Sequence, residues 1–230
     1  MKSKEIAFKI LKELKEKNID AYLGGGSSRE YLLKKEFIDI DICSKGTPEM
    51  NLLALSNYEL ISKEGKFYGV LKYIIEDYEI EITTLRKEGP YIKKRRPSYV
   101  EFIDNLEIDS LRRDFTINAI YIDYLGNIYD YHNGLNDLNN KVIRMIGDPC
   151  LRIEEDALRI LRAIRLSEKL NFSIEDNLKN IIKEKHESIY LLNRNTLKKE
   201  LDKFLEFKSK EEIEDILKEY QIEMGKIYEY

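Results

Sequence analysis

The chain has 230 residues, 43% of them hydrophobic, so it is long enough for one large domain or two smaller ones with a buried core. Its 39 basic and 43 acidic residues leave a net charge of −4, which excludes coating of nucleic acid through overall charge. Two cysteines and two histidines exclude a disulfide framework and a zinc cluster, and no apolar run is long enough to cross a membrane.

The N-terminal part alternates between helical and extended patterns. Apolar residues at helical spacing predict a helix over residues 2–17, and Ala21–Leu23 is typical of a short strand. The following segment from Gly24 to Ser28 predicts a turn that opens a second helix, with a serine as its N-cap.

The next elements are a strand, a helix and a hairpin. Strict alternation of apolar and polar residues over Phe37–Ile42 predicts a strand. Thr47-Pro48-Glu49 is typical of a helix start with proline at the first helical position. Residues 67–75 and 78–85 are rich in β-forming residues and predict a hairpin that turns at Glu76-Asp77.

The pattern changes towards the C-terminus, where residues from about 148 onwards are almost all helical, with interruptions at Asn171 and Asn193. We therefore expect a mixed α and β head over residues 1–137 and a helical neck over residues 138–206. A short helical segment is expected over residues 207–230.

Three consecutive glycines, Gly24 to Gly26, allow the backbone to approach a ligand closely, and the N-terminus of the next helix favours a phosphate. A tight strand–helix turn without a ligand explains the same residues equally well. The segment is not a P-loop, because no Gly-Lys-Ser/Thr follows, and it lacks the spacing of a dinucleotide fingerprint.

Asp39 and Asp41 are two residues apart on the expected strand and therefore share one face. Carboxylates so close repel each other unless a cation lies between them, and hard oxygen ligands are what Mg²⁺ requires. Two solvated acids on an amphipathic strand are the alternative.

Glu79 and Glu81 share a face of a later strand, and one of them completes a metal site if the two strands are neighbours.

Two further segments combine charge with a regular pattern. The basic clusters Lys93–Arg96 and Arg112-Arg113 suit triphosphate oxygens, although a solvated loop is the default for such runs. A helix predicted over residues 152–165 carries Asp156 and Arg159 opposite its apolar stripe. They form either an ordinary helix ion pair or a donor and acceptor edge for a nucleobase.

In this order the motifs resemble the class II tRNA nucleotidyltransferases (CCA-adding enzymes) and the bacterial poly(A) polymerases. The resemblance runs from about residue 21 to residue 170 and is specific, because many spaced elements agree. The elements are the GGxxR turn ending at Arg29, the Asp39-x-Asp41 pair, Glu81 to Arg86, Arg112 to Ala119, Gly134 to Pro149 and Glu155 to Arg165.

The resemblance implies an α+β fold, with a DNA polymerase beta-like nucleotidyltransferase head and an all-helical neck. It implies that Asp39, Asp41 and Glu81 are the catalytic residues and hold Mg²⁺. Asp156 and Arg159 would pair with the Watson–Crick edge of ATP or CTP, so that protein replaces a template. The nucleotide-binding residues that it implies are Gly25, Gly26, Arg29, Arg113, Asp114, Asn118, Asp156, Arg159, Arg162 and Arg165.

The implied reaction is the addition of CMP, AMP or both to the 3′ end of tRNA in the cytoplasm. A poly(A) polymerase acting on other RNA ends, or a catalytically dead nucleotide- or RNA-binding module, is the alternative. The family's body and tail domains have no room in 230 residues. Either the chain is a piece of a longer protein, or it is a minimal form in which a homodimer or a partner protein compensates for the missing tail. No membrane partner is expected.

Three segments depart from the family pattern. Ser28 and Glu30 stand where the family has an apolar residue and an aspartate, and Lys93 replaces an acid in a loop that helps the change from CTP to ATP. In the neck, Asn195 and Thr196 replace a charge pair. We expect altered packing beneath the glycine turn and altered nucleotide switching.

Overall fold

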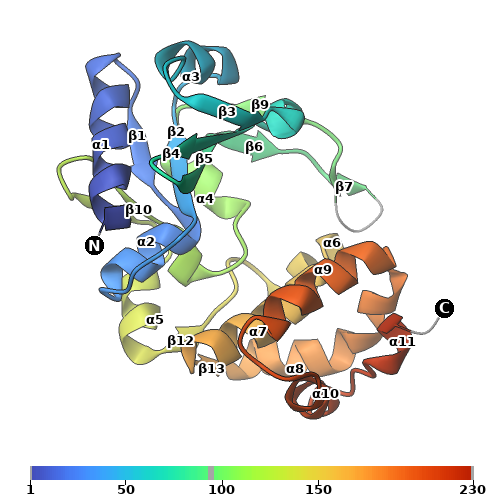
Figure 1. Ribbon diagram of the computed structural model, residues 1–230. Coiled ribbons are helices and arrows are strands. Elements are labelled where there is room, and N and C mark those ends of the chain that lie inside the picture. The colour runs from blue at the N-terminus through green and yellow to red at the C-terminus, as the bar shows by residue number, and fades with distance from the viewer. Residues whose placement is uncertain (1, 93–95, 229–230) are drawn as a thin grey trace. The chain divides into compact units, whose positions relative to one another are not determined.

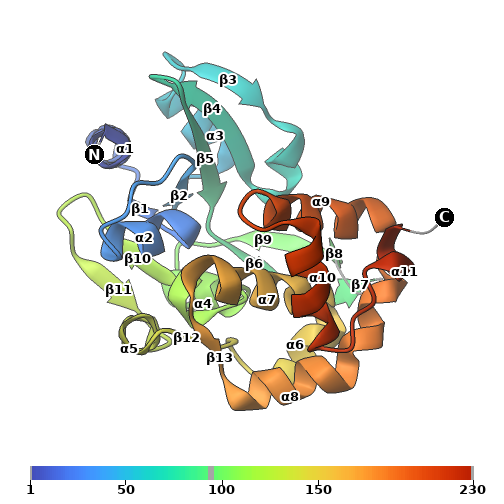
Figure 2. The ribbon, with the colours of Figure 1, turned by 60° about the horizontal axis from the view of Figure 1, so that its bottom comes forward.

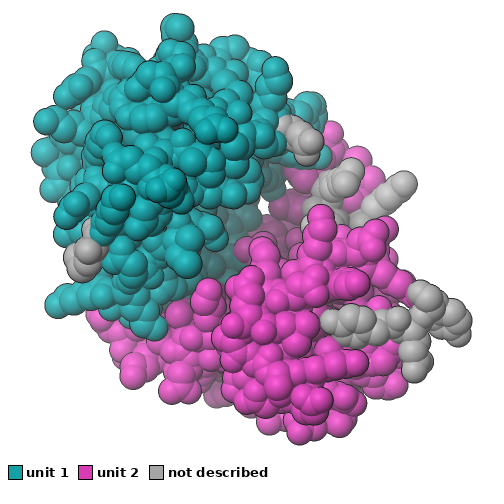
Figure 3. Space-filling model, in the orientation of Figure 1, with its two compact units in different colours: residues 1–89, 99–136 teal, residues 90–98, 137–230 magenta. Residues whose placement is uncertain are grey.

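The structure, a computed structural model, describes residues 2–92 and 96–228 (Figure 1). The chain divides into two compact units, which are coloured separately in Figure 3. Unit 1 comprises Met1–Gly89 and Tyr99–Asn136, and unit 2 comprises Pro90–Ser98 and Asp137–Tyr230. The segment from Pro90 to Ser98 therefore groups with the C-terminal residues, although it lies within the sequence of the expected head.

Unit 1 combines helices with a mixed sheet. Its helices, with two 3₁₀ segments (η), are α1 (Lys2–Glu16), α2 (Gly25–Leu32), α3 (Pro48–Ala54), η1 (Glu64–Tyr68), α4 (Leu106–Leu111) and η2 (Thr116–Asn118); α5 (Gly134–Asn140) crosses into unit 2. Its strands are β1 (Ala21–Leu23), β2 (Ile40–Ser44), β3 (Glu59–Ser62), β4 (Val70–Ile75), β5 (Tyr78–Thr84), β6 (Arg86–Glu88), β9 (Val100–Phe102), β10 (Ile120–Ile122) and β11 (Ile128–Asp130).

The sheet of unit 1 joins seven strands of the described residues in the order β11-β10-β1-β2-β5-β4-β3. Neighbouring strands are antiparallel except β2 and β5, which run parallel and place Asp41 opposite Glu81. The mixed sheet with its covering helices confirms the expected α+β head. It also confirms that the strands carrying these two acids are neighbours.

The two faces of the sheet differ because apolar and polar residues alternate along β2 and β5. Ile40 and Ile42 of β2 are buried in a core with Ile80 and Ile82 of β5 and with the apolar stripe of α1. Figure 2 shows α1 nearly along its axis, beside the strands that it covers. The opposite face carries Asp41 and Glu81, which are partly buried, so the core holds the strands while their acidic side chains lie outside it.

Unit 2 is mainly helical, as expected, but it also contains short strands. The two-residue strands β12 and β13 pair in parallel, and their brevity left no periodicity to detect. None of the helices in the described part of the chain is long and apolar enough to span a membrane. The elements are β7 (Tyr91–Ile92), β8 (Arg96–Pro97), β12 (Val142–Ile143), α6 (Pro149–Glu155), α7 (Leu158–Leu170), β13 (Ser173–Ile174), α8 (Asp176–Lys185), η3 (His186–Leu191), α9 (Arg194–Leu205), α10 (Lys210–Lys218) and α11 (Gly225–Tyr228).

Several local predictions are confirmed. The Thr47 side chain caps α3 by accepting the Met50 N–H, and Pro48 occupies the first helical position. The hairpin turns at Glu76 and Asp77, both with positive φ, as a tight two-residue turn requires. Asn171 ends α7 in the left-handed conformation, which asparagine tolerates well.

Other local predictions are wrong in instructive ways. The strand expected over Phe37–Ile42 begins only at Ile40, so Asp39 lies just before β2 and not on it. Gly24, not a serine, is the N-cap of α2, and it makes no side-chain cap. The helix expected over residues 152–165 is broken at Asp156, where α6 ends and the side chain accepts the Leu158 N–H that opens α7 (3.1 Å).

Candidate active site

The candidate site lies where β2 and β5 run side by side. Asp41 and Glu81 are direct partners in the parallel register, so their side chains leave the same face of the sheet. Asp39 is exposed immediately before β2. Three carboxylates of this region therefore come from two neighbouring strands and the residue that precedes one of them.

The glycine turn is built directly against Asp41. The Gly24 N–H donates to the Asp41 carbonyl oxygen (3.0 Å), and the Gly26 N–H donates to the Asp41 carboxylate (3.0 Å). Gly25 has a φ of +59°, and a Cβ there would lie 2.6 Å from Asp41 Oδ2. Only glycine satisfies both the backbone conformation and this close approach.

Ser27 holds the acidic segment in place and was not among the residues predicted from sequence. Its hydroxyl donates to the Asp39 carbonyl oxygen (2.9 Å) and accepts the Asp41 N–H (2.8 Å). These bonds tie the start of β2 to the glycine turn. The Ser27 side chain is fully buried, and its burial becomes visible only in the fold, because the sequence shows just a serine that follows three glycines.

The electrostatics of the site suit a bound cation. Burial, and next the negative charge of Glu81, raise the pKa of Asp41 to about 6, although the Gly26 N–H and the Arg113 guanidinium act in the opposite direction. A carboxylate that is costly to ionise beside another carboxylate is stabilised by a positive charge between them. The hard oxygen donors of Asp39, Asp41 and Glu81 fit a divalent cation such as Mg²⁺.

The carboxylates are not gathered into a closed ligand set. Across the residues that the structure describes, no group of three His, Cys, Asp or Glu side chains is close enough to hold a metal ion. One oxygen of Glu81 lies 3.6 Å from Lys72 Nζ, and the Thr83 hydroxyl donates to the other (3.4 Å). The orientation of the Glu81 side chain towards these two residues accounts for the open arrangement.

Arg29 and Asn118 belong to one buried polar chain next to the glycine turn. The Arg29 guanidinium donates to Glu30 (2.7 Å) and to the Asn118 side-chain oxygen (2.5 Å). The Asn118 amide in turn donates to Asp114 (3.2 Å). Glu30, which departs from the family pattern, supplies the acid that pairs with Arg29.

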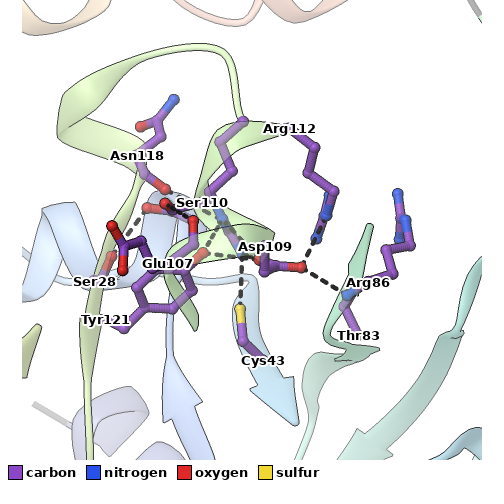
Figure 4. Close-up of polar contacts among 12 residues, drawn as sticks. Ser28, Cys43, Thr83, Arg86, Glu107, Asp109, Ser110, Arg112, Asn118 and Tyr121 are labelled. Carbon is purple, nitrogen blue, oxygen red and sulfur yellow. Dashed lines mark hydrogen bonds and ion pairs between the residues drawn. The ribbon is translucent and has the colours of Figure 1, made fainter. Parts of the chain in front are cut away.

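Arg113 lies in a second network beside Gly24 of the glycine turn, where its guanidinium bonds to other protein groups. It donates to the Tyr121 hydroxyl (2.9 Å), to Cys43 Sγ (2.9 Å) and to the carboxylate of Asp109. Asp109 is fully buried and also accepts from Arg112 (2.9 Å), as Figure 4 shows. Burial acts to raise the pKa of Asp109, but Arg112 and Arg113 outweigh it and hold that pKa at about 2.

The predicted residues of the neck lie together in unit 2. Arg159 is buried, with its guanidinium 5.5 Å from the Tyr91 ring centroid and hydrogen-bonded to Glu155 (3.0 Å). Asp156 lies at the break between α6 and α7, one turn before Arg159. Glu155 and Tyr91, which sequence reasoning did not single out as functional residues, therefore fix the position of the Arg159 side chain.

The remaining arginines of α7 have different surroundings. Arg165 donates to Glu200 of α9 (2.6 Å), a buried acid, so it joins two helices of unit 2. Arg162 is partly buried on the same helix. Of the basic cluster at residues 93–96, residues 93–95 lie outside the described part of the chain.

A mixed sheet with an acidic strand end against a glycine turn is the nucleotidyltransferase head fold. Residues 21–144 match the poly A polymerase head domain, and the chain belongs to this family. The chain is 39% identical over 201 residues to a CCA-adding enzyme of Staphylococcus epidermidis, and the aligned region covers 87% of this chain and 50% of that protein. It is 42% identical over 170 residues to a CCA-adding enzyme of Streptococcus uberis, and the aligned region covers 74% of this chain and 41% of that protein.

Solved structures of CCA-adding enzymes and tRNA nucleotidyltransferases are similar to this chain as well. The CCA-adding enzyme of Bacillus stearothermophilus in complex with CTP matches with a TM-score of 0.78 and 29% identity, over 89% of this chain and 49% of that one. A tRNA nucleotidyltransferase complexed with a primer tRNA and an incoming ATP analog matches with a TM-score of 0.74 and 29% identity, over 97% of this chain and 62% of that one. The chain spans about half the length of the curated relatives that it matches.

Proposed function

We propose that this protein adds CMP, AMP or both to the 3′ end of tRNA without a nucleic-acid template. The observation that carries the proposal is the in-register pair of Asp41 and Glu81, with a glycine turn built against one of its carboxylates. Support also comes from relatives that are CCA-adding enzymes. In the proposed reaction the RNA 3′-oxygen forms a bond to the α-phosphorus of the nucleotide, the bond to the departing pyrophosphate breaks, and the hydroxyl proton is released.

Nucleotidyltransferases of this family use divalent metal ions. In the proposal Asp39, Asp41 and Glu81 hold Mg²⁺ at the acidic end of β2. When bound, divalent ions lower the pKa of an attacking hydroxyl and neutralise the charge of departing phosphate oxygens. The contribution of the chain itself is positioning, because Ser27 and the Gly26 N–H fix the two aspartates before a substrate arrives.

The proposed site for the triphosphate is the glycine turn and the residues packed next to it. The turn formed by Gly25 and Gly26 leaves no side chain in the way of a phosphate beside Asp41. Arg29 supplies a positively charged guanidinium, whose orientation is fixed by its bonds to Glu30 and Asn118. Two further residues position this region without contacting the phosphate in the proposal. Asp114 does so through its bond to Asn118, and Arg113 does so through its bond to Tyr121.

Base recognition is assigned to the segment between α6 and α7. We propose that Asp156 and Arg159 offer an acceptor and a donor edge to the Watson–Crick positions of ATP or CTP. Glu155 and the ring of Tyr91 hold the Arg159 guanidinium in a fixed plane, which a specific hydrogen-bonding edge needs. Arg165, through Glu200, supports α7, and Arg162 is proposed to bind phosphate from the same helix.

The test offers the protein tRNAs that lack the last three, two or one nucleotides, and an unstructured RNA, with CTP, ATP or both. Sequenced products that end in the completed CCA identify a CCA-adding enzyme, and products with a single A added only after CC identify an A-adding one. Long A tails on the unstructured RNA would identify a poly(A) polymerase. Absence of any magnesium-dependent incorporation by the wild-type protein would contradict the proposed activity.

A further inference from the structure

One row of charged side chains crosses three neighbouring strands at the acidic site. In the sheet register Lys72 of β4 is the direct partner of Glu81, and Glu81 is the direct partner of Asp41. Direct partners project from the same face of a sheet, so a cation and two anions lie in line on the face that carries the proposed metal ligands. The line places Lys72 next to the third carboxylate of the site.

The contacts of Lys72 divide between two acids. Its ammonium lies 3.6 Å from Glu81 Oε2 and donates a hydrogen bond to Glu79. The side chains of Lys72 and Glu81 are 38% and 35% exposed, so solvent screens their attraction. Glu79 gives Lys72 a second anionic partner that is not one of the proposed metal ligands.

We infer that Lys72 is the counter-ion of the metal-free site and that a divalent cation must displace it from Glu81. This inference rests on the proposed function, because it takes Glu81 as a metal ligand. In the absence of metal the ammonium offsets the repulsion between Glu81 and Asp41. A bound divalent cation needs the same carboxylate oxygens and repels the ammonium, which then stays with Glu79.

Two consequences follow. Lys72 lowers the metal affinity of the site, because binding must break the Lys72–Glu81 contact and bring a divalent cation near a positive charge. Lys72 also stabilises the metal-free fold by screening neighbouring acids. Lys72 is therefore a positioning residue that sets how strongly the site holds its metal, and it explains why Glu79 accompanies Glu81 on β5.

The experiment measures equilibrium binding of Mn²⁺ to the full chain at low ionic strength, from the electron paramagnetic resonance signal of the free ion. Lys72→Met is compared with the wild type and with Lys9→Met as the matched control. Lys9 forms an ion pair with Glu76 (2.8 Å), but it belongs to α1, which packs on the opposite face of the sheet. We expect Lys72→Met to bind Mn²⁺ about fivefold more tightly, as the modest energies of half-exposed ion pairs suggest, and Lys9→Met to bind like the wild type.

Further variants separate failure of the inference from failure of the proposed function. Asp41→Asn is expected to lose Mn²⁺ binding, and Lys72→Met is expected to bring no gain when Glu81→Gln is already present. Unchanged affinity in Lys72→Met and in Lys72→Gln, with binding lost in Asp41→Asn, would overturn the inference alone. Wild-type binding by Asp41→Asn would overturn the metal site and the inference together. In EDTA, the melting temperature of Lys72→Met is expected to be lower than that of the wild type and to rise more on addition of Mn²⁺.

Discussion

At the scale of single residues, the acidic site depends on a serine that carries no charge. Ser27 joins the backbone on both sides of Ile40 through one hydroxyl, and that hydroxyl is fully buried. A side chain two residues before Arg29 in a glycine-rich turn does not stand out in the sequence. Its role becomes visible only when the turn is folded against β2.

Replacement of Ser27 by alanine removes both hydrogen bonds and leaves the Asp39 carbonyl oxygen and the Asp41 N–H without that partner. We expect the turnover rate of nucleotide incorporation to fall about tenfold, the equivalent of a typical hydrogen bond, while the KM for the nucleotide changes little. Steady-state kinetics on a tRNA primer measure both values. Ser28→Ala is the control, because the buried Ser28 hydroxyl donates to the Gly25 carbonyl oxygen (3.2 Å), whereas the Ser27 hydroxyl bonds to the backbone of Asp39 and Asp41. Equal losses in the two variants would show that Ser27 has no special role.

At the scale of elements, the strand–turn–helix unit around Gly25 requires both a positive φ and the absence of a side chain next to Asp41. Gly126 shares only the first of these requirements. Gly25 and Gly126 both have positive φ, at +59° and +88°, but a Cβ at Gly126 meets nothing within 4 Å. Gly25→Ala adds a clash with Asp41 to the backbone strain that both substitutions share. We expect each variant to lose about 1 kcal/mol of unfolding free energy from strain, and only Gly25→Ala to lose more than tenfold in incorporation. Denaturant titrations and primer-extension rates test the two parts separately.

A second prediction at this scale concerns the attachment of α4 to the sheet. Asp109 of α4 accepts hydrogen bonds from Arg112, from Tyr121 of β10 (2.8 Å) and from the backbone N–H of Arg86 (3.0 Å). We expect Asp109→Asn to lower the unfolding free energy at pH 7 by about 3 kcal/mol, because buried cations lose their anion. The folded pKa of about 2 lies below the ordinary value of 3.8, so this stabilisation is complete above pH 3.8 and is lost as the pH falls through 2. Denaturation curves should therefore converge for wild type and variant in strong acid, and a constant difference down to pH 2 would contradict this account.

The elements that sequence predicted correctly have local signals. Thr47 and Pro48 mark the start of α3 through capping and a fixed φ, and the β4–β5 hairpin follows from two β-rich runs around a two-residue turn. The break at Asp156 could not be predicted in the same way, since the apolar stripe continues from Ile153 to Ile160 across it. The extended backbone of Asp156 (φ −146°, ψ 98°) separates α6 from α7, and the Asp156 side chain accepts the Leu158 N–H there, a contact that periodicity does not report.

Contacts between distant segments were accessible only through the resemblance to a family. Alternation placed Glu79 and Glu81 on one face of a strand, but the parallel register that sets Glu81 against Asp41 depends on residues far apart in the chain. Likewise, a pair of arginines in sequence does not reveal that Arg113 is held beside the glycine turn by Tyr121 and Cys43. Sequence predicted the charged groups of the site, and the fold determines which of them face one another.

At the scale of the whole molecule, the chain consists of two compact units, each with its own part of the proposed chemistry. Unit 1 carries the acidic strand end and the glycine turn, and unit 2 carries Asp156 and Arg159. The proposal thus assigns bond formation to one unit and base choice to the other. Substitutions of Arg159 are expected to change which nucleotide is added, and substitutions of Asp41 are expected to abolish addition of either.

The most direct test of the central claim compares Asp41→Asn with the wild type in single-turnover incorporation of labelled CMP or AMP into a tRNA primer. Asp77→Asn is the matched control, because Asp77 is exposed in the β4–β5 turn and asparagine tolerates its positive φ. The account predicts a fall of about a thousandfold or more in Asp41→Asn, with folding retained by circular dichroism, and an unchanged rate in Asp77→Asn. Incorporation by Asp41→Asn at the rate of Asp77→Asn would contradict it.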